Sequence, residues 1–232
     1  MSSPYFRFRQ FTVWHDRSSL RVGTDGVLIG AWAGQSIQPS HILDVGTGCG
    51  LIALMMAQRF PDAHIRGIDI DAASIGQARD NIAASPWADR IDVEQADFNQ
   101  TSGAYDLIVS NPPYFYEDTL AATSQRTLAR HTITLTFAQL ISKSLTMLSA
   151  GGRLAVILPH SAASAFIGTA ATYGLRLTCR CDVCSNPQRP PRRTMLELAT
   201  QAADTNLQTL VIRTDDNRPT DEYLRLTRDF YL

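Results

Sequence analysis

An alternation of short apolar runs with longer segments of helical period begins at residue 41, and it constrains the fold of this chain most strongly. Short continuous apolar runs are typical of parallel strands buried on both faces, and the segments between them are long enough for connecting helices. We therefore expect an α/β fold, doubly wound around a mostly parallel seven-stranded sheet with one antiparallel edge strand. The expected strands cover about 42–45, 65–69, 91–93, 105–110, 153–158, 175–183 and 194–200, with a further strand near 207–213.

Capping and breaking residues set the bounds of the expected helices. A helix over about 50–60 ends at Pro61, which cannot continue it, and Asp71 is suited to cap a helix over about 72–84. Residues 136–139 have the spacing of a capping box and open a third helix. Further helices are expected around residues 28–32, over about 162–173 and from residue 221.

Length and composition fit one domain without a membrane segment. With 232 residues, 44% of them hydrophobic, the chain can bury a large core, and a doubly wound sheet of this size commonly forms a single domain. No segment approaches the roughly 20 apolar residues that span a bilayer, and the first residues lack the apolar core of a signal peptide. We therefore expect a cytoplasmic protein with no membrane contact, and the sequence indicates no obligate protein partner.

Three of the four cysteines lie in one short segment, at positions 179, 181 and 184. The Cys-x-x-Cys spacing is that of a zinc ligand pair. However, the segment has the pattern of a strand in which Cys179 and Cys181 share one face, and no second Cys or His pair completes a tetrahedral site. We expect no metal site, and reduced, partly buried thiols instead.

The first strand ends in the glycine-rich turn Gly46-Thr47-Gly48-Cys49-Gly50, which opens a helix. Glycine at 46 and 48 lets the backbone approach a flat nucleoside. Asp69 follows about twenty residues later at the end of the next strand, where it is placed for ribose hydroxyls. The sequence therefore predicts a nucleoside-containing ligand at this edge of the sheet.

The spacing of the glycines distinguishes between possible cofactors. Dinucleotide folds use G-x-G-x-x-G with the helix directed at a pyrophosphate, whereas the spacing here is G-x-G-x-G. Asp44, directly before the turn, would repel a pyrophosphate but suits the cationic methionyl end of S-adenosyl-L-methionine (SAM). SAM is favoured over NAD and over a purely structural turn. Asp97, after the third strand, is placed to accept from the cofactor's adenine, the alternative being a solvated acid at a strand end.

Asn111-Pro112-Pro113-Tyr114 follows the fourth strand, at the sheet edge where ligands of such folds bind. The prolines hold Asn111 extended, so that its side-chain oxygen and the Pro112 carbonyl can converge on one amino group. Two such dipoles stabilise the positive charge that methyl transfer creates on nitrogen, while Tyr114 can stack on the target. An amide acceptor suits adenine N6, guanine N2 and a glutamine side chain alike, and an isolated Asn-Pro-Pro can be merely a turn.

Four segments together resemble the class I SAM-dependent methyltransferases with an Asn-Pro-Pro-Tyr motif, namely DVGTGCG (44–50), GIDID (67–71), AD (96–97) and SNPPY (110–114). Residues 21–32 and the ending 229–232 are similar to one family in particular, the bacterial tRNA (adenine-N6)-methyltransferases that modify the adenine next to the anticodon of a valine tRNA. The likeness covers nearly the whole chain. It implies a Rossmann-like methyltransferase sheet and methyl transfer from SAM to adenine N6 in a tRNA anticodon loop.

The resemblance also implies which residues perform these roles. The cofactor-binding residues are expected to be Thr24, Asp25, Asp44, Gly46, Gly48, Gly50, Asp69, Asp97 and Asn111. The catalytic residues are expected to be Asn111, Pro112 and Tyr114, with Pro113 and Tyr114 also binding the target base. Residues 1–36 are expected to form an N-terminal cap over the cofactor and substrate site, although Asp25 is equally suited to cap the helix that follows it.

Basic residues alternate with aromatic residues near the N-terminus, as suits an RNA backbone with splayed bases. The positions are Arg7, Arg9, Arg17 and Arg21 among Phe6, Phe8, Phe11 and Trp14, and a second, proline-rich cluster holds Arg189, Arg192 and Arg193. We take Arg7, Arg9, Arg192 and Arg193 as candidate tRNA contacts, and Arg130 and His131 as weaker ones. The alternative is a solvated face above buried aromatics.

Two other functions fit parts of the same pattern. Glutamine N5-methyltransferases that act on release factors share the Asn-Pro-Pro-Tyr motif, but they carry an N-terminal helical domain, and only about forty residues precede the first strand here. A non-catalytic RNA-binding module would not need the complete set of acids and the intact tetrapeptide. Both are retained as alternatives to tRNA methylation.

Overall fold

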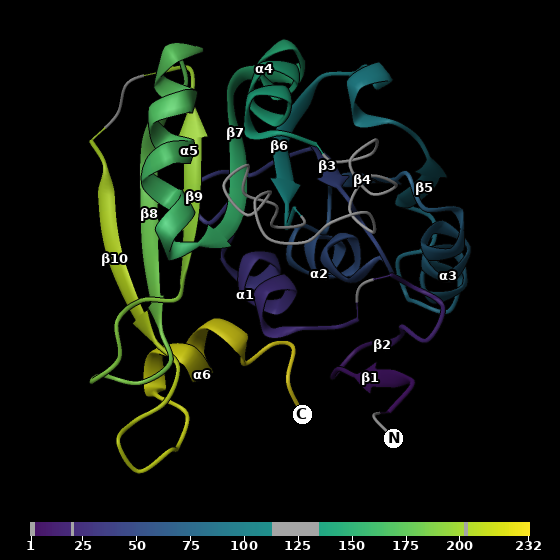
Figure 1. Cartoon of the computed structure of the whole chain (residues 1–232). Coiled ribbons are helices and arrows are strands. Elements are labelled where there is room, and N and C mark those ends of the chain that lie inside the picture. Colours follow the sequence, from purple (N-terminus) through teal and green to yellow (C-terminus); the bar gives the residue numbers. More distant parts are fainter. Residues whose placement is uncertain (1–2, 20, 113–134, 202–203) are drawn as a thin grey trace, which may run out of the picture.

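The computed structural model describes residues 3–19, 21–112, 135–201 and 204–232 of the chain. Its centre is a sheet in which the described residues form eight strands, in the order β10-β8-β9-β7-β6-β3-β4-β5 (Figure 1). The strands are β3 (His41–Val45), β4 (His64–Asp69), β5 (Ile91–Gln95), β6 (Tyr105–Ser110), β7 (Leu148–Pro159), β8 (Arg176–Cys184), β9 (Arg193–Ala199) and β10 (Asn206–Val211).

The sheet is parallel except for β9, which pairs antiparallel with both β7 and β8. The doubly wound α/β class and the mostly parallel sheet are confirmed. The sheet has eight strands in the described residues instead of seven, because β10 pairs parallel with β8. The antiparallel strand β9 therefore lies inside the sheet, between β7 and the parallel pair of β8 and β10.

Helices cover both faces of the sheet, and each face has its own hydrophobic cluster. Alternate residues of β3 separate to the two sides, since Ile42 packs into the cluster under α1, α2 and α3, and Leu43 into the cluster under α4 and α5. The helices are α1 (Thr24–Trp32), α2 (Leu51–Arg59), α3 (Ala72–Ala83), α4 (Phe137–Met147), α5 (His160–Thr172) and α6 (Asp221–Thr227). None of the described helices is long and apolar enough to cross a membrane.

Two helix caps expected from the sequence are confirmed. The Asp71 carboxylate accepts hydrogen bonds from the backbone of Ala73 and Ser74 at the start of α3. Thr136 and Gln139 form both hydrogen bonds of a capping box at the start of α4. These local signals bound the helices to within one or two residues of their expected ends.

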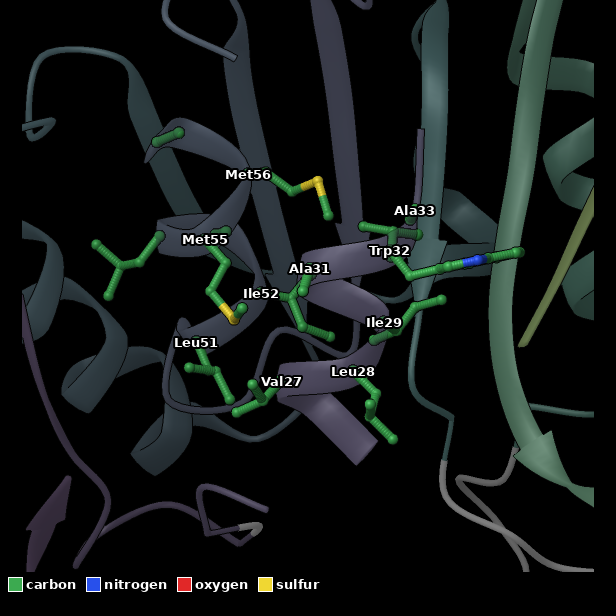
Figure 2. Close-up of a cluster of buried hydrophobic side chains, with 14 of the residues drawn as sticks. Val27, Leu28, Ile29, Ala31, Trp32, Ala33, Leu51, Ile52, Met55 and Met56 are labelled. Carbon is green, nitrogen blue, oxygen red and sulfur yellow. The ribbon is translucent and has the colours of Figure 1, made fainter. Parts of the chain in front are cut away.

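Helices α1 and α2 pack unusually closely, through two glycines of α1 (Figure 2). A Cβ at Gly26 would lie 2.9 Å from a Leu51 methyl carbon, and one at Gly30 would lie 2.6 Å from the Met55 sulfur. Because these glycines are four residues apart, they lie on the same face of α1. Their lack of side chains lets the two helices approach each other under the glycine-rich turn.

The N-terminal residues form a small hairpin of β1 (Tyr5–Arg7) and β2 (Thr12–Trp14), which the sequence pattern did not predict. Strands of three residues are too short for a recognisable alternation. The hairpin lies below α3 in Figure 1, and the chain continues from it to α1. Phe8, Phe11 and Val13 are buried and anchor the hairpin to the core.

Candidate cofactor and substrate site

The carboxyl ends of β3, β4, β5 and β6 meet at one edge of the sheet, because these strands are parallel and in register. The register places Asp69 opposite Gln95, and Val45 opposite both Ile68 and Ser110. The Ser110 hydroxyl donates to the Val45 carbonyl at 2.8 Å and ties β6 to the start of the glycine-rich turn. The segments singled out in the sequence are therefore brought together.

Glycine is required in the turn after β3 by the backbone itself. Gly46, Gly48 and Gly50 have φ angles of 73°, 56° and 84°, in the left-handed region that other residues rarely adopt. The backbone amides of Gly46 and Thr47 both donate to the Ile68 carbonyl, which fixes the turn against the end of β4. A Cβ at Gly46 would meet no protein atom within 4 Å. The turn therefore presents bare backbone to open space, as close contact with a ligand demands.

Asp44 is completely buried beneath this turn, and it does not line the pocket itself. Its Oδ2 accepts from the Thr47 hydroxyl at 2.6 Å and from the Ala53 amide at 3.1 Å, whereas Oδ1 has no hydrogen-bond partner in the described structure. The pKa of Asp44 is raised to about 7: burial is the main cause and the nearby Asp69 charge adds to it, while these two hydrogen bonds oppose the shift. A positive group above the turn would compensate this partly satisfied carboxylate.

Asp69 binds the turn from the end of β4. Its Oδ2 accepts from the Gly48 amide and its Oδ1 from the Asp71 amide, both at 2.9 Å. Each carboxylate oxygen can accept a second hydrogen bond, so the pair retains the capacity to bind two hydroxyl groups. Ile70, next to it, is a large apolar residue that is 48% exposed at the same strand end, and it was not expected from the sequence.

Asp97 follows β5 and caps the one-turn helix η1 (Phe98–Gln100). Its Oδ1 accepts from the backbone amide and the side-chain amide of Asn99 at 2.9 and 3.2 Å. Asp97 is half-buried. It caps η1 and lies at the same edge of the sheet as Asp69.

A pocket of about 540 Å³ opens above the turn. Its lining residues are Arg21, Gly23, Thr24, Asp25, Gly26, Gly46, Thr47, Gly48, Cys49, Leu51, Ile52, Asn111 and Pro112. Of the expected cofactor residues, Thr24, Asp25, Gly46, Gly48 and Asn111 lie here, whereas Gly50 packs against Ala78 of α3. The apolar lining from α2 was not expected from the sequence. The signal for it was present, since Leu51 and Ile52 directly follow the glycine-rich turn.

The Asn-Pro segment forms one wall of this pocket. Asn111 directly follows β6 and is half-buried, and Pro112 is buried. The expected residues Pro113 and Tyr114, and the weaker candidates Arg130 and His131, lie outside the described residues.

Asp25 does not cap α1, because the N-cap is Gly23 and no side chain caps the helix. Instead, Asp25 lies in the first turn, where its Oδ2 pairs with Nε of Arg193 at 2.7 Å. This ion pair joins the pocket wall to the start of β9, across 168 positions of sequence. Arg193 is thus engaged with the pocket wall, and Arg192 is exposed beside it.

The N-terminal arginines have different surroundings. Arg9 donates from Nε to the Tyr231 carbonyl, and Arg17 pairs with Asp80 of α3. Arg7 is exposed. The alternation of basic and aromatic residues therefore combines residues that hold the N-terminus in place with residues that face solvent.

The three cysteines of β8 are free thiols within the strand. Burial raises the pKa of Cys179 to about 11 and that of Cys181 to about 12. Both therefore remain protonated at neutral pH, which disfavours metal ligation and nucleophilic chemistry.

Solved structures share this fold. A predicted O-methyltransferase from Agrobacterium tumefaciens has a TM-score of 0.67 and 17% identity, with 89% of this chain and 96% of that chain covered. A ribosomal protein L11 methylase from Lactobacillus delbrueckii has a TM-score of 0.57 and 14% identity, with 82% and 84% covered. A parallel sheet of this kind, with a glycine-rich turn opening a pocket at its carboxyl edge, defines the Rossmann-like class of α/β folds.

Sequence comparison is more specific than the fold. The family model described as "Methyltransferase small domain" matches residues 27–167. Proteins named "tRNA1(Val) (adenine(37)-N6)-methyltransferase" are 42% identical in Bacteroides thetaiotaomicron and 44% identical in Phocaeicola vulgatus, each over 100% of this chain and 99% of the relative. One from Klebsiella pneumoniae is 42% identical over 98% of this chain and 94% of the relative. The chain belongs to the methyltransferase small domain family and, within it, to the family that these relatives form.

Proposed function

We propose that this protein transfers a methyl group from SAM to N6 of an adenine in a tRNA anticodon loop. The observation that carries the proposal is the pocket that joins the glycine-rich turn to Asn111 and Pro112, in a chain that matches tRNA adenine-N6 methyltransferases over its whole length. tRNA modification is expected to take place in the cytoplasm, where the substrate is made.

Two features of the described residues fit SAM. The open space at Gly46 accommodates a ligand against bare backbone, and the unpartnered Oδ1 of Asp44 favours a cationic group above the turn, as the methionyl ammonium provides. Asp69 would accept from the ribose hydroxyls, and Asp97 from the adenine amino group. Thr24 and Asp25 would close the methionyl end from α1.

When bound, SAM supplies an electrophilic methyl group, and the chain must hold and polarise the target nitrogen beside it. The side-chain oxygen of Asn111 and the carbonyl of Pro112 would accept the two hydrogens of the adenine amino group. This directs the nitrogen lone pair out of the ring plane, and it stabilises the positive charge that develops during transfer. Pro113 and Tyr114 would hold the target adenine. The C–S bond of SAM would break as the C–N bond forms, and S-adenosylhomocysteine would leave. The methylated nitrogen, positively charged and therefore acidic, would lose its proton to water, so no side chain has to act as a general base.

We also infer that residues 1–232 act as a single domain, with residues 1–36 capping the cofactor and substrate site. Arg21, Gly23 and Thr24 from this segment line the pocket beside the glycine-rich turn, which supports the proposal. Arg193 would hold Asp25 in position, while Arg192 remains exposed for RNA.

The test is incubation of the protein with tritiated SAM and either total tRNA or purified release factor, followed by digestion of the products. We expect label in N6-methyladenosine from tRNA, and its rate of incorporation should fall by about a hundredfold or more when Asn111 is changed to Ala. Label in N5-methylglutamine would identify a release-factor methyltransferase, and label in N2-methylguanosine would change the target base. Absence of transfer to any of these, with intact SAM binding, would favour a non-catalytic RNA-binding module.

A further inference from the structure

We propose that the outward face of the N-terminal hairpin is a stacking platform for unpaired bases of the RNA substrate, formed by Tyr5 and Trp14 with Arg7 beside them. The proposal rests on the RNA methylation proposed above, and it assigns an interaction surface outside the pocket. The partner is a single-stranded part of the same RNA.

The two strands of the hairpin place Tyr5, Arg7, Thr12 and Trp14 on one face. The register pairs Tyr5 with Trp14 and Arg7 with Thr12. Since directly paired residues of antiparallel strands point to the same side, these four side chains share one face. On the other face Val13 is completely buried and its partner Phe6 is 37% exposed, whereas Tyr5 is 42% and Trp14 is 48% exposed. The hairpin thus turns two aromatic rings and one arginine to solvent.

The chemistry of this face matches single-stranded RNA. The rings of Tyr5 and Trp14 lie 5.0 Å apart between centroids and are tilted by 49°, so they form one continuous aromatic surface. Every base has a flat face that stacks on such a surface, whereas bases inside a duplex are not accessible to it. Arg7 makes no ion pair or side-chain hydrogen bond with the described part of the chain, and its guanidinium is available for a phosphate.

Asn81 fixes this face to the cofactor site. The side chain of Asn81 on α3 is almost fully buried, and its Oδ1 accepts from the Trp14 amide at 2.9 Å. Its Nδ2 donates to the Trp14 carbonyl at 2.8 Å and to the Cys49 carbonyl at 2.9 Å. Cys49 lines the pocket. One amide group therefore binds both the backbone under the Trp14 ring and the glycine-rich turn.

The same helix face holds the chain between the hairpin and the pocket. Gln77 accepts from the amides of Arg17 and Ser18, and Ser74 accepts from the amide of Ser19. Because residues 74, 77 and 81 are three and four apart, they form one stripe along α3. The platform is therefore rigid before RNA binds, which lowers the entropic cost of association.

The experiment measures the affinity of the full chain for a synthetic anticodon stem-loop of a valine tRNA, by fluorescence anisotropy with S-adenosylhomocysteine present. We expect Trp14→Ala and Tyr5→Ala each to weaken binding by about tenfold, and Trp14→Phe by less than about threefold, because a phenyl ring still stacks. Arg7→Gln should lower the salt dependence of log Kd by about one unit of slope. Since Asn81 binds the backbone of Trp14 and not its side chain, these side-chain changes leave the Asn81 hydrogen bonds in place.

Matched controls come from the amino edge of the sheet, where Tyr173 and Arg176 are also exposed. Tyr173→Ala and Arg176→Gln should leave RNA affinity within about twofold. In the hairpin variants, KM for RNA should rise while kcat at saturating RNA and the affinity for SAM remain those of the wild type. A structural role would instead lower the melting temperature and leave KM unchanged.

Several outcomes would overturn the platform. Unchanged RNA affinity in Trp14→Ala and Tyr5→Ala, with a wild type that methylates tRNA, would remove the platform and leave the proposed function standing. An equal loss of affinity for a fully paired duplex of the same length would show contact with the backbone rather than with bases. A wild type that neither binds nor methylates any RNA would overturn the proposed function first, and the platform with it.

Discussion

The tripeptide Ser-Asn-Pro occurs twice in this chain, each time at the end of a strand at the carboxyl edge of the same sheet. Residues 110–112 begin with the last residue of β6, and residues 185–187 directly follow β8. In the first, Ser110 is buried and bonded to β3, and Asn111 faces the pocket. In the second, Ser185 is exposed, and the Asn186 side chain accepts from the Gln188 amide in a local turn. The motif lines a pocket only where its strand adjoins the glycine-rich turn, and our proposal gives it a chemical role only there.

Two buried carboxylates show the same difference between the two halves of the sheet. Burial raises the pKa of both Asp44 on β3 and Glu197 on β9. Glu197 accepts from the Gly34 amide at 2.6 Å, and the positive charges of Arg153 and Arg59 oppose its shift. Asp44 has another acid nearby and an unpartnered oxygen. One half of the sheet compensates its buried charge, and the half with the pocket leaves it partly uncompensated, as is common at binding sites.

The largest expected effect tests the two tripeptides against each other. Asn111→Ala should lower kcat for methyl transfer by about a hundredfold or more, because one preorganised dipole at the reacting nitrogen is lost. Affinity for SAM should stay within a few-fold. Asn186→Ala is the matched control and should leave kcat unchanged. Single-turnover kinetics with labelled SAM measure both, and equal rates in the two variants would return Asn111-Pro112 to the role of a turn.

The next effect concerns SAM binding at the end of β4. Asp69→Ala should weaken SAM binding by roughly ten- to a hundredfold, because charged hydrogen bonds to the ribose contribute about 1.5 to 3 kcal/mol. Titration calorimetry on folded protein measures the change. Asp92→Ala, at an exposed position of β5, is the control with wild-type affinity. If Asp69→Ala binds SAM as tightly as the wild type, the cofactor does not lie along this edge as proposed.

The pKa of Asp44 predicts a moderate effect of pH. Since it is raised to about 7, Asp44 ionises above neutral pH and should then bind the SAM ammonium more strongly. SAM affinity should rise several-fold between pH 6 and 8 in the wild type, and less in Asp44→Asn. Without SAM, the folded state holds this proton between about pH 4 and 7 while the unfolded state releases it, so stability falls as pH rises through that window. Calorimetry and thermal unfolding across this range test both, and identical pH profiles in the two proteins would contradict them.

The smallest effect on the site is expected from the other buried acid. Glu197→Gln keeps an acceptor for Gly34 but removes the charge, so unfolding free energy should fall by about 1 to 3 kcal/mol. SAM affinity should remain within about twofold. Denaturant unfolding and calorimetry separate the two quantities. A large loss of SAM affinity without a loss of stability would show that Glu197 acts on SAM binding, which would contradict the proposed difference between the two halves of the sheet.

Local patterns in the sequence were sufficient for much of the fold. The strands of the central sheet, the glycine-rich turn and the caps at Asp71 and Thr136 each depend on neighbouring residues, and these were predicted. The part of the site that lies at the strand ends was predicted, because parallel strands bring their carboxyl ends to one edge of the sheet whatever the details of packing.

Contacts between distant segments were not predictable in this way. The Asp25–Arg193 ion pair joins residues 168 positions apart, and the buried Asn81 binds the backbone of Trp14, 67 positions away. In a single sequence, such polar residues cannot be distinguished from ordinary surface residues. The place of β10 beside β8 likewise depends on pairing across the sheet, which the apolar pattern of a single strand does not specify.

The close approach of α1 to α2 has a consequence for redesign of this protein. Gly26 lines the pocket, and Gly30 lies one turn further along the same helix, so together they act as a spacer that sets how far the Thr24–Asp25 wall stands from the glycine-rich turn. The width of the pocket is thus determined partly by residues that contribute no side-chain atoms to it. Gly30→Ala would press its Cβ against Met55 and move α1 away from α2, which would widen the pocket for a bulkier alkyl donor while leaving every lining residue in place.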